Sequence, residues 1–453
     1  MVYKVIGLMS GSSLDGLDIA YVELQEQHST NRQAPRTWGY QILQTACYPY
    51  PTEWKRRLAA APGLPALDYQ LLHAEYGHYL GERVLQFIEA HGLHYRVQLI
   101  ASHGHTGFHD PARRMTAQLG DGAAIAATTG INVVSDLRAM DVALGGQGAP
   151  IVPIGEALLL PGYEFFLNLG GIANVSRHGR GPGGADVSAT HGSVGGAGVS
   201  AMQASGGPTG AAATQTSSGG ADAPATHRFV AFDVCPANRV LNALAADLGL
   251  EYDAEGALAA GGRVDAALLD RLNALPYYGM PYPKSLANEF GTETVLPMLR
   301  QAGLSTSDAL RTYVEHIAEQ VGRAVGLLGW EAGAAGLNPD AAEARPEAVA
   351  AERPAAGVAA MESVAWAAGV AAKMLVTGGG AHNGFLIDRL REHLAVRGVE
   401  LVVPEPQLVD YKESLVMALI GVLRWREEKN VLASVTGARR DSIGGAVWIG
   451  QEA

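Results

Sequence analysis

Three glycine-rich segments of the chain hold residue types that suit phosphate binding. They are residues 11–18 (GSSLDGLD), 168–174 (NLGGIAN) and 378–383 (GGGAHN). Glycines allow backbone N–H groups to approach a phosphate closely, and serine hydroxyls add further donors. Because a phosphate clamp needs donors from several directions, three such segments in one chain favour a nucleotide site built from separate loops.

Two aspartates in the first segment suit a divalent cation. Asp15 and Asp18 could hold a magnesium ion through water molecules. The segment is not a Walker loop, because it lacks the GK[ST] ending. An ordinary turn is the other interpretation, and it is the commoner use of neighbouring glycines and serines.

A single carboxylate stands at the end of another apolar run. Asp233 follows residues 229–232 (FVAF) and leads into a loop that contains Pro236. A carboxylate in this position suits a general base. A helix N-cap or Asx-turn aspartate is the alternative, and residue type alone favours it.

Polar residues of one further region suit either a metal or a polyhydroxylated ligand. His103, His105 and His109 lie on one loop, but no clear carboxylate or cysteine partner accompanies them, so the sequence disfavours a zinc site. Residues 136–141 (DLRAMD), which precede the glycines of residues 145–148, could bind a sugar or form a salt-bridged loop.

The elements that must position these residues alternate between strand and helix patterns. Residues 5–9 and 17–24 flank the first glycine segment and predict a β-hairpin. Ligands collect at strand ends in α/β folds. Four more apolar runs end in small polar loops: residues 96–102, 165–169, 229–232 and 373–377.

Apolar residues at helical spacing predict three core helices. Ser307 is the expected N-cap of the first of them. The stripes are Leu310, Val314, Ile317, Val321 and Leu328; Leu386, Leu390 and Leu394; and Leu415, Leu419, Val422 and Leu423.

Composition limits the class of protein. The 453 residues include 33 Lys+Arg and 45 Asp+Glu, a net charge of -12, with 48% hydrophobic residues, which is typical of a globular protein of about two domains. The acidic balance and the lack of a basic run argue against nucleic-acid or anionic-membrane partners. No stretch resembles a signal peptide or a membrane span, and only Cys47 and Cys235 are present, so we expect a cytoplasmic protein.

Two compositionally biased segments interrupt the chain. Residues 179–226 are mostly Gly, Ala, Ser and Thr, with no aromatic residue, and residues 331–370 are rich in alanine. The first segment cannot bury enough apolar surface to offset its ordering entropy, and we expect a flexible insertion. The second is also expected to be an insertion.

Taken together, the motifs resemble the anhydro-N-acetylmuramic acid kinase family, a branch of the sugar kinase, Hsp70 and actin superfamily. The resemblance covers the chain apart from the two insertions. Its segments are GLMSGSSLDGLD (7–18), SHGHTGFHDP (102–111), the long stretch 118–153, FLNLGGIANVS (166–176), FDVCPAN (232–238), PKSLANE (283–289), VTGGGAHN (376–383), KESLVMALIG (412–421) and SVTGA (434–438).

The resemblance implies an α/β fold of two actin-like domains with a central cleft. We expect an N-terminal domain over residues 1–150, with part of the C-terminal helices packing back on it, and a C-terminal domain over residues 151–453. A homodimer is implied by the family alone.

The resemblance also implies a reaction in which ATP and water convert 1,6-anhydro-N-acetylmuramic acid to N-acetylmuramic acid 6-phosphate during murein recycling. Asp233 would be the base that activates the water, and Mg²⁺ would accompany ATP. The implied ATP-binding residues are Gly11, Ser12, Ser13, Leu14, Asp15, Gly16, Leu17 and Asp18, then Asn168, Gly170 and Gly171, and finally Gly378, Gly379, Gly380 and Asn383.

The implied sugar contacts come from several segments. Arg138 is chosen on chemical grounds, because a guanidinium suits the lactyl carboxylate of the sugar. The full set is His103, Thr106, Asp136, Arg138, Asp141 and Glu413.

Some positions depart from the family pattern. Around the base, FDTGPGN becomes FDVCPAN, so that Val234, Cys235 and Ala237 replace a hydroxyl and two glycines. Added Cβ atoms would matter where a ligand or backbone approaches closely. His105 replaces a glutamine, and residues 286–288 also differ. A related kinase with a shifted substrate and a non-catalytic nucleotide-binding scaffold therefore remain alternatives.

Overall fold

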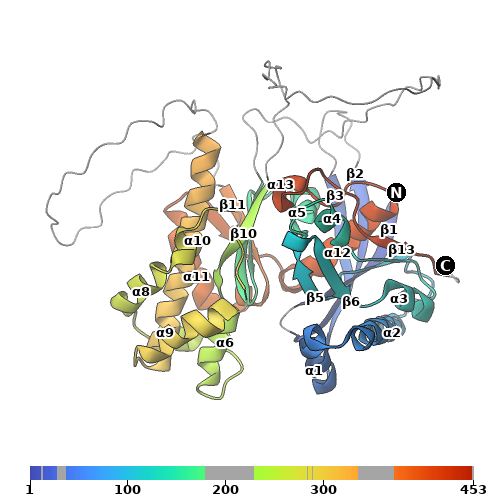
Figure 1. Ribbon diagram of the computed structural model, residues 1–453. Coiled ribbons are helices and arrows are strands. Elements are labelled where there is room, and N and C mark those ends of the chain that lie inside the picture. The colour runs from blue at the N-terminus through green and yellow to red at the C-terminus, as the bar shows by residue number, and fades with distance from the viewer. Residues whose placement is uncertain are drawn as a thin grey trace, which may run out of the picture.

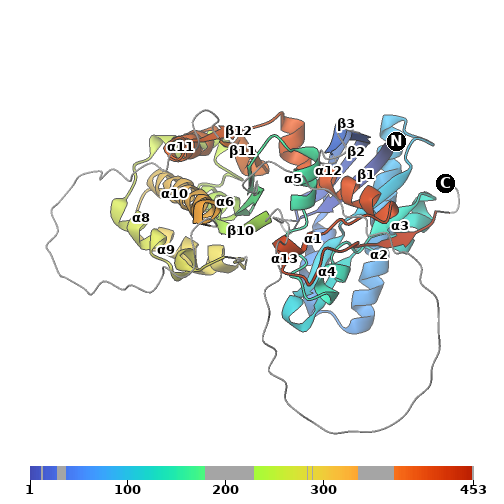
Figure 2. The same ribbon diagram turned by 90° about the horizontal axis from the view of Figure 1, so that it is seen from above.

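The computed structural model describes residues 1–11, 14–27, 37–178, 229–282, 284–287, 289–334 and 372–450. These residues form two lobes (Figures 1 and 2). The predicted insertion at residues 179–226 lies outside the described residues, and so does all but the start of the one at 331–370.

A mixed sheet forms the centre of the first lobe. Its strand order is β13-β7-β4-β1-β2-β3. Strands β1 and β2 form the predicted hairpin, β3 pairs antiparallel with β2, and β4 and β7 run parallel to β1. The strands are β1 (Val2–Ser10), β2 (Gly16–Gln27), β3 (Thr37–Pro49), β4 (Leu99–Ser102), β7 (Val133–Ser135) and β13 (Ala446–Trp448).

The second lobe repeats this topology. Its sheet has the order β10-β9-β8-β11-β12, with three antiparallel strands followed by two parallel ones. Each lobe thus places its first three strands as a meander and adds two crossover strands beside the first, which confirms the two-domain actin-like fold. The strands are β8 (Phe165–Leu169), β9 (Ile172–His178), β10 (Phe229–Pro236), β11 (Ala372–Thr377) and β12 (Val399–Val402).

Helices cover both faces of the first sheet. Side chains alternate along β1, so Ile6 faces the cluster beneath α1 and α2, whereas Val5 faces α12. Helix α12 also contacts β11 of the second sheet and α5, which precedes β8, so it lies against both lobes. The helices are α1 (Thr52–Ala60), α2 (Ala66–His91), α3 (Gly122–Thr129), α4 (Ala139–Ala143), α5 (Pro153–Leu159), α12 (Pro406–Trp425) and α13 (Ala433–Thr436).

The helices of the second lobe pack around α10. Every residue of the three predicted stripes is buried, which confirms those core helices. A small hairpin, β5 (His105–Asp110) with β6 (Met115–Leu119), projects from the first lobe. The second-lobe helices are α6 (Asn238–Ala246), α7 (Ala257–Gly261), α8 (Ala266–Asn273), α9 (Leu296–Gln301), α10 (Thr306–Ala334) and α11 (Gly384–Ala395).

The predicted cap of α10 is wrong. Ser307 lies inside the first turn, whereas the hydroxyl of Ser305 accepts a hydrogen bond from the Asp308 N–H at 3.1 Å. The Asp308 carboxylate in turn accepts from the Ser305 hydroxyl, so Ser305 begins the helix as a capping residue. Sequence reasoning chose the second of two nearby serines.

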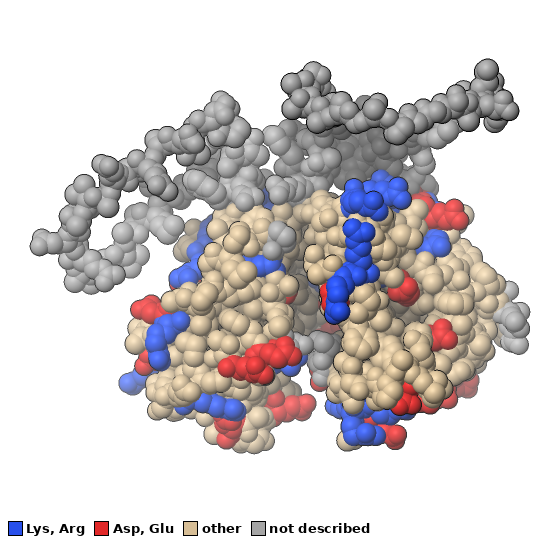
Figure 3. Space-filling model, viewed as in Figure 1, with Lys and Arg blue, Asp and Glu red and all other residues tan. Residues whose placement is uncertain are grey.

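The surface carries both signs of charge. On the face shown in Figure 3, basic and acidic side chains are interspersed, and a groove separates the two lobes. None of the described helices is long and apolar enough to cross a membrane.

Candidate active site

A cavity of about 190 Å³ lies where the two lobes meet. Residues from the β1–β2 turn, the β8–β9 turn, the end of β11 and the first turns of α12 line it. They are Met9, Gly11, Asp15, Gly16, Asp18, Cys47, Asn168, Gly170, Thr377, Gly378, Gly379, Val409, Asp410, Lys412 and Glu413. The three glycine-rich segments, far apart in sequence, therefore share one cavity.

The predicted nucleotide residues divide into two groups. Eight of them line this cavity, as given above. Leu14, Leu17, Gly171, Gly380 and Asn383 do not, and Ser12 and Ser13 lie outside the described residues.

Close backbone packing explains two of the glycines. A Cβ atom at Gly16 would lie 2.8 Å from Cys47 Sγ and from the Tyr48 carbonyl oxygen. At Gly378, φ is +83° and a Cβ would lie 2.6 Å from Asn168 Oδ1. Glycine is needed at both positions to bring the turns of the two lobes to the cavity.

Asn383 and the β8–β9 turn form hydrogen bonds that stabilise the fold. Asn383 Oδ1 accepts from the Leu386 N–H at 2.9 Å and caps α11. The carbonyl oxygens of Gly170 and Gly171 accept backbone hydrogen bonds from residues 238 and 237, which fixes the β8–β9 turn on the start of α6.

Carboxylates gather on one side of the cavity. The pKa of Asp18 is raised to about 6, chiefly by burial and to a smaller extent by the charges of Glu413, Asp410 and Asp15, while a hydrogen bond with Cys47 opposes the shift. The four carboxylates create a strongly negative site when empty of cations. No group of three or more His, Cys, Asp or Glu side chains in the described part of the chain could hold a metal ion by itself.

The residues present fit a magnesium-bound phosphate chain. Thr377 is fully buried, and its hydroxyl lines the cavity with no hydrogen-bond partner among the described residues. Glycine turns give close approach, the hydroxyl offers a donor, and the carboxylates suit a hydrated Mg²⁺ ion, which keeps most of its waters.

Asp233 lies near the end of β10, opposite Asn174 of β9, and is not among the residues that line the interlobe cavity. Its Oδ2 accepts from the Leu286 N–H at 2.8 Å, and its carbonyl oxygen accepts from the Tyr277 hydroxyl at 2.6 Å. Burial raises the pKa of the Asp233 carboxyl, and the Leu286 N–H opposes the shift. No described residue donates to Oδ1, so that oxygen is available to a ligand.

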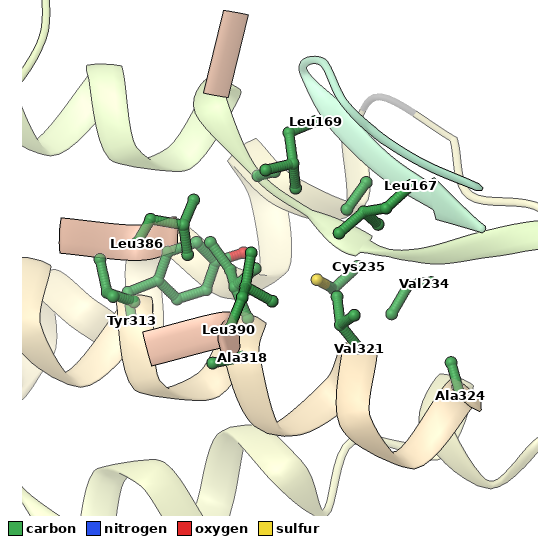
Figure 4. Close-up of a cluster of buried hydrophobic side chains, with 14 of the residues drawn as sticks. Leu167, Leu169, Val234, Cys235, Tyr313, Ala318, Val321, Ala324, Leu386 and Leu390 are labelled. Atoms are coloured by element: carbon green, nitrogen blue, oxygen red, sulfur yellow. The ribbon is translucent and has the colours of Figure 1, made fainter. Parts of the chain in front are cut away.

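The departures from the family pattern face away from this carboxylate. Val234, Cys235 and Ala237 are buried in the core of the second lobe, where Figure 4 shows the first two near Leu167 and Val321. A bulge between Asp233 and Cys235 shifts the register with β9. None of the three has a positive φ, so their Cβ atoms are accommodated without left-handed strain.

The predicted sugar residues form a chain of contacts rather than one cluster. Arg138 Nε donates to His103 Nε2 at 2.9 Å, and Arg138 Nη1 donates to the Gly148 carbonyl oxygen at 2.6 Å. His103 Nδ1 lies 2.8 Å from the Gly104 carbonyl oxygen, so the ring is neutral with its proton on Nδ1, and burial lowers its pKa to about 3. Burial lowers the pKa of Arg138 to about 10, and the carboxylates of Glu413 and Asp141 oppose that shift.

The remaining three predicted residues differ in setting. Asp141 is fully buried, and its carboxylate accepts from the Gly148 N–H at 2.8 Å and from the Thr436 hydroxyl at 2.7 Å, so it organises the loop that holds Arg138. Asp136 is exposed with a φ of +53°, and Thr106 is exposed on β5.

Glu413 and the neighbouring Lys412 each contact a residue on another element. Burial raises the pKa of Glu413, whose Oε1 accepts from Asn168 Nδ2 at 3.2 Å. Lys412 forms a buried ion pair with Glu156 of α5 at 2.8 Å. These contacts join α12 to both the β8–β9 turn and the segment between the lobes.

Sequence reasoning missed several lining residues. Thr377 lies in the segment VTGGGAHN and Lys412 in KESLVMALIG, but neither was chosen as a site residue, and Asp410 lies outside every matching segment. Their closeness in sequence to chosen residues was the only available signal. A second cavity, of about 290 Å³, includes His103 and Asp136 in its lining.

Comparisons with known proteins place these features in one family. A family model described as anhydro-N-acetylmuramic acid kinase matches residues 3–188, 223–334 and 340–450. A Gloeobacter violaceus protein of that name is 31% identical over 449 residues, covering 96% of each chain. One from Vibrio parahaemolyticus is 28% identical over 452 residues, covering 96% of this chain and 95% of the other.

A solved structure also superposes weakly. It is the activator of 2-hydroxyisocaproyl-CoA dehydratase from Clostridium difficile with bound ADPNP, with a TM-score of 0.37 and 13% identity over 94% of this chain and 96% of that one.

Proposed function

The chain belongs to the anhydro-N-acetylmuramic acid kinase family, and from that premise we propose that it uses ATP and water to convert 1,6-anhydro-N-acetylmuramic acid to N-acetylmuramic acid 6-phosphate in murein recycling. The observation that carries the proposal is the position of Asp233. Its carboxylate has one oxygen anchored by the Leu286 N–H and one that accepts from no described residue. It stands on β10, which pairs with β9, and the β8–β9 turn joins the other two glycine-rich segments at the interlobe cavity.

The interlobe cavity would hold the phosphates of ATP. Gly11, Gly170 and Gly378 allow the chain to come close to the phosphates, and the Thr377 hydroxyl supplies a donor. Mg²⁺ bound with ATP would neutralise charge on the phosphate oxygens. Asp15 and Asp18 would orient its water ligands.

Asp233 would act as the general base. Its Oδ1 accepts a proton from water as the water oxygen bonds to the anomeric carbon, and the bond from that carbon to O6 breaks. The freed O6 then takes the γ-phosphoryl group, with ADP as the leaving group. A raised pKa makes the carboxylate a stronger base, and the Leu286 N–H fixes its orientation.

Arg138 would bind the lactyl carboxylate of the sugar. Its Nε and Nη1 already donate within the protein, and no described residue accepts from Nη2. This geometry supports a single charged hydrogen bond instead of a bidentate fork. Glu413 would position Arg138 from the side of the phosphates.

Two further proposals concern the cellular location and the oligomeric state of the protein. A cytoplasmic location provides both ATP and the reducing conditions that suit two free cysteines, Cys47 and Cys235. We propose a homodimer from family membership.

Mass spectrometry of the product tests the reaction. With Mg-ATP and the anhydro sugar, we expect ADP and a sugar that has gained both a phosphoryl group and the elements of water. A product that gained only the phosphoryl group would show direct phosphorylation of an intact bridge. Turnover with another sugar alone would favour a shifted substrate, and nucleotide binding without turnover would favour a scaffold.

A further inference from the structure

The second cavity lies wholly in the first lobe. Ser102 ends β4 and Ser135 ends β7, and both line it, so it opens at the carboxyl ends of parallel strands, where α/β proteins place ligands. Helix α2 and the β5–β6 hairpin supply the other walls. At about 290 Å³ it is larger than the interlobe cavity.

Three buried polar atoms in this lining have no partner among the described residues. They are the Tyr69 hydroxyl, Ser102 Oγ and Gln118 Oε1, on side chains that are 8%, 1% and 9% exposed. Buried polar groups are nearly always hydrogen-bonded in folded proteins. Three unpartnered polar groups on residues that line one cavity therefore mark it as a candidate site for a polar ligand.

The hydrogen-bonding groups of these three side chains, one acceptor and two donors, are complementary to the N–H and C=O of a secondary amide. Gln118 Nε2 donates to Thr116 Oγ1 at 2.8 Å, which identifies Oε1 as the free acceptor. Burial raises the pKa of Tyr69, so its hydroxyl keeps its proton and can donate. The Ser102 hydroxyl is a second donor.

The charges around the cavity disfavour an anionic group inside it. Its lining has no lysine or arginine, and it includes the carboxylates of Asp121 and Asp136. The Trp448 indole, fixed by its N–H bond to Ser135 Oγ at 3.1 Å, adds an aromatic wall that suits a methyl group.

We propose that this cavity is the subsite for the acetamido group of the amino sugar. Gln118 Oε1 accepts from the amide N–H, and Tyr69 and Ser102 donate to its carbonyl oxygen. The inference rests on the proposed function, to which it is joined by His103. That residue lines the cavity and accepts from Arg138 Nε, and Arg138 is the proposed partner of the lactyl carboxylate of the same sugar.

Steric contacts support Tyr69 as a placed donor. A Cβ atom at Gly107 would lie 2.4 Å from the Tyr69 hydroxyl, so the glycine leaves room for that group. The Tyr69 ring packs against Phe108 with a centroid distance of 5.0 Å. Replacing tyrosine with phenylalanine therefore removes the hydroxyl and keeps the packing.

The test compares two sugars on four proteins. The sugars are 1,6-anhydro-N-acetylmuramic acid and its analogue with a hydroxyl in place of the acetamido group. The proteins are the wild type, Tyr69→Phe, Gln118→Met and the control Tyr79→Phe, which makes the same change on α2 outside the cavity. Thermal melting checks that each protein is folded.

In Tyr69→Phe and Gln118→Met, we expect kcat/KM for the acetylated sugar to fall roughly tenfold, mainly through KM, as for loss of a hydrogen bond. The analogue's kcat/KM and the KM for ATP should not change, and the control should match the wild type. Suppose that the wild type turns over the acetylated sugar, and that the ratio of kcat/KM for the two sugars is the same in both variants as in the wild type. The proposed subsite is then wrong, and the kinase function stands.

Calorimetric binding of the same sugars separates the two proposals. If the wild type binds the acetylated sugar without turning it over, weaker binding in the variants supports the subsite while the proposed reaction fails. Equal binding of both sugars by all four proteins, or no sugar binding by the wild type, overturns the subsite.

Discussion

Asp233 and Asp18 are carboxylates whose pKa burial raises, yet their surroundings suit different tasks. Burial is the main cause of the raised pKa of Asp233, and the Leu286 N–H holds one of its oxygens, a setting that favours proton abstraction. Asp18 shares one side of the interlobe cavity with three further carboxylates, a setting that favours cation binding. The two pKa shifts have the same direction, but the surroundings assign different roles: Asp233 as a base and Asp18 as a group that orients the metal.

Asp18→Asn should separate stability from function. The pKa of Asp18 is higher in the folded protein than its ordinary value of 3.8, so the folded state loses stability as pH rises from about 4 to 6, and the loss is complete above that. Removing the charge should raise the free energy of unfolding at pH 7.5 by about 1–2 kcal/mol, after allowance for partial solvation. Denaturant unfolding without nucleotide measures this, and an unchanged midpoint would contradict it.

The same carboxylate should make magnesium use pH-dependent. Since Asp18 must be ionised to attract the cation, the apparent affinity for Mg²⁺ in the ATP reaction should fall as pH drops below about 6. The Asn variant should need more Mg²⁺ at every pH and should lose this dependence. A magnesium titration at pH 5.5 and pH 7.5 checks both statements.

Single residues show where sequence reasoning worked and where it could not. Asp15 and Asp18 were identified from residue type within a glycine-rich turn, and they do line the cavity. Asp141 was expected near the sugar, but its carboxylate is used by Gly148 and Thr436, and Thr436 is remote in sequence. Residue type cannot distinguish a ligand-binding carboxylate from one that organises a loop.

At the scale of elements, the pair formed by α5 and α12 connects the lobes. The ammonium of Lys412 and the carboxylate of Glu156 are almost fully buried, and Ser176 on β9 donates to the same carboxylate. Helix α12 therefore fixes Glu413 relative to the second sheet. A buried pair of this kind is most damaging when only one partner is removed.

Lys412→Met should lower the free energy of unfolding by about 3–5 kcal/mol, because it leaves the Glu156 charge buried and unpaired. Lys412→Met with Glu156→Gln should recover most of that loss. The control Lys373→Met breaks an exposed pair with Glu400 and should cost at most about 1 kcal/mol. Urea unfolding of the variants measures these differences. Equal losses in the free energy of unfolding for Lys412→Met and the control would contradict the expected role of the buried pair.

Three residues at the end of β10, Val234, Cys235 and Ala237, differ from the family pattern around Asp233. Cys235→Gly with Ala237→Gly should destabilise the protein by about 2 kcal/mol, since it empties buried core space. It should change kcat/KM less than about threefold, because the lost atoms face the core rather than Asp233. A gain in activity above tenfold would mean that these side chains do hinder the site.

Element prediction succeeded for the three apolar stripes, but it missed long elements as well as short ones, since α2 (26 residues) and β3 (13 residues) were not predicted. The stripes of α10, α11 and α12 are buried as expected. The three-residue strand β13 and the β5–β6 hairpin were not predicted, because such short segments hold too few residues for a period to emerge.

At the scale of the whole molecule, the repeated strand order explains why the site lies between lobes. Each sheet directs a glycine-bearing hairpin, β1–β2 or β8–β9, toward the same cavity. Apolar runs predicted several of the strands but not their order in the sheets, which depends on contacts distant in sequence. The resemblance to a known family predicted the two-domain fold with a central cleft, and the strand order comes from the structure.

The two sides of the first biased segment are close together. His178 at the end of β9 pairs with Phe229 at the start of β10, so a two-residue turn could join them in place of residues 179–228. We expect this deletion to leave kcat within about twofold of the full chain, because the composition of the segment is unsuited to forming a site. A steady-state assay checks this, and a tenfold loss would assign the segment a role.

The central claim is that Asp233 activates water in an ATP-dependent opening of the anhydro sugar. The most direct measurement is ADP release with Mg-ATP, with and without 1,6-anhydro-N-acetylmuramic acid, in the wild type, in Asp233→Asn and in the exposed control Asp388→Asn. The account predicts sugar-dependent release in the wild type and the control, and a loss of roughly 10²–10⁴-fold in Asp233→Asn. Sugar-dependent release that survives in Asp233→Asn would contradict it.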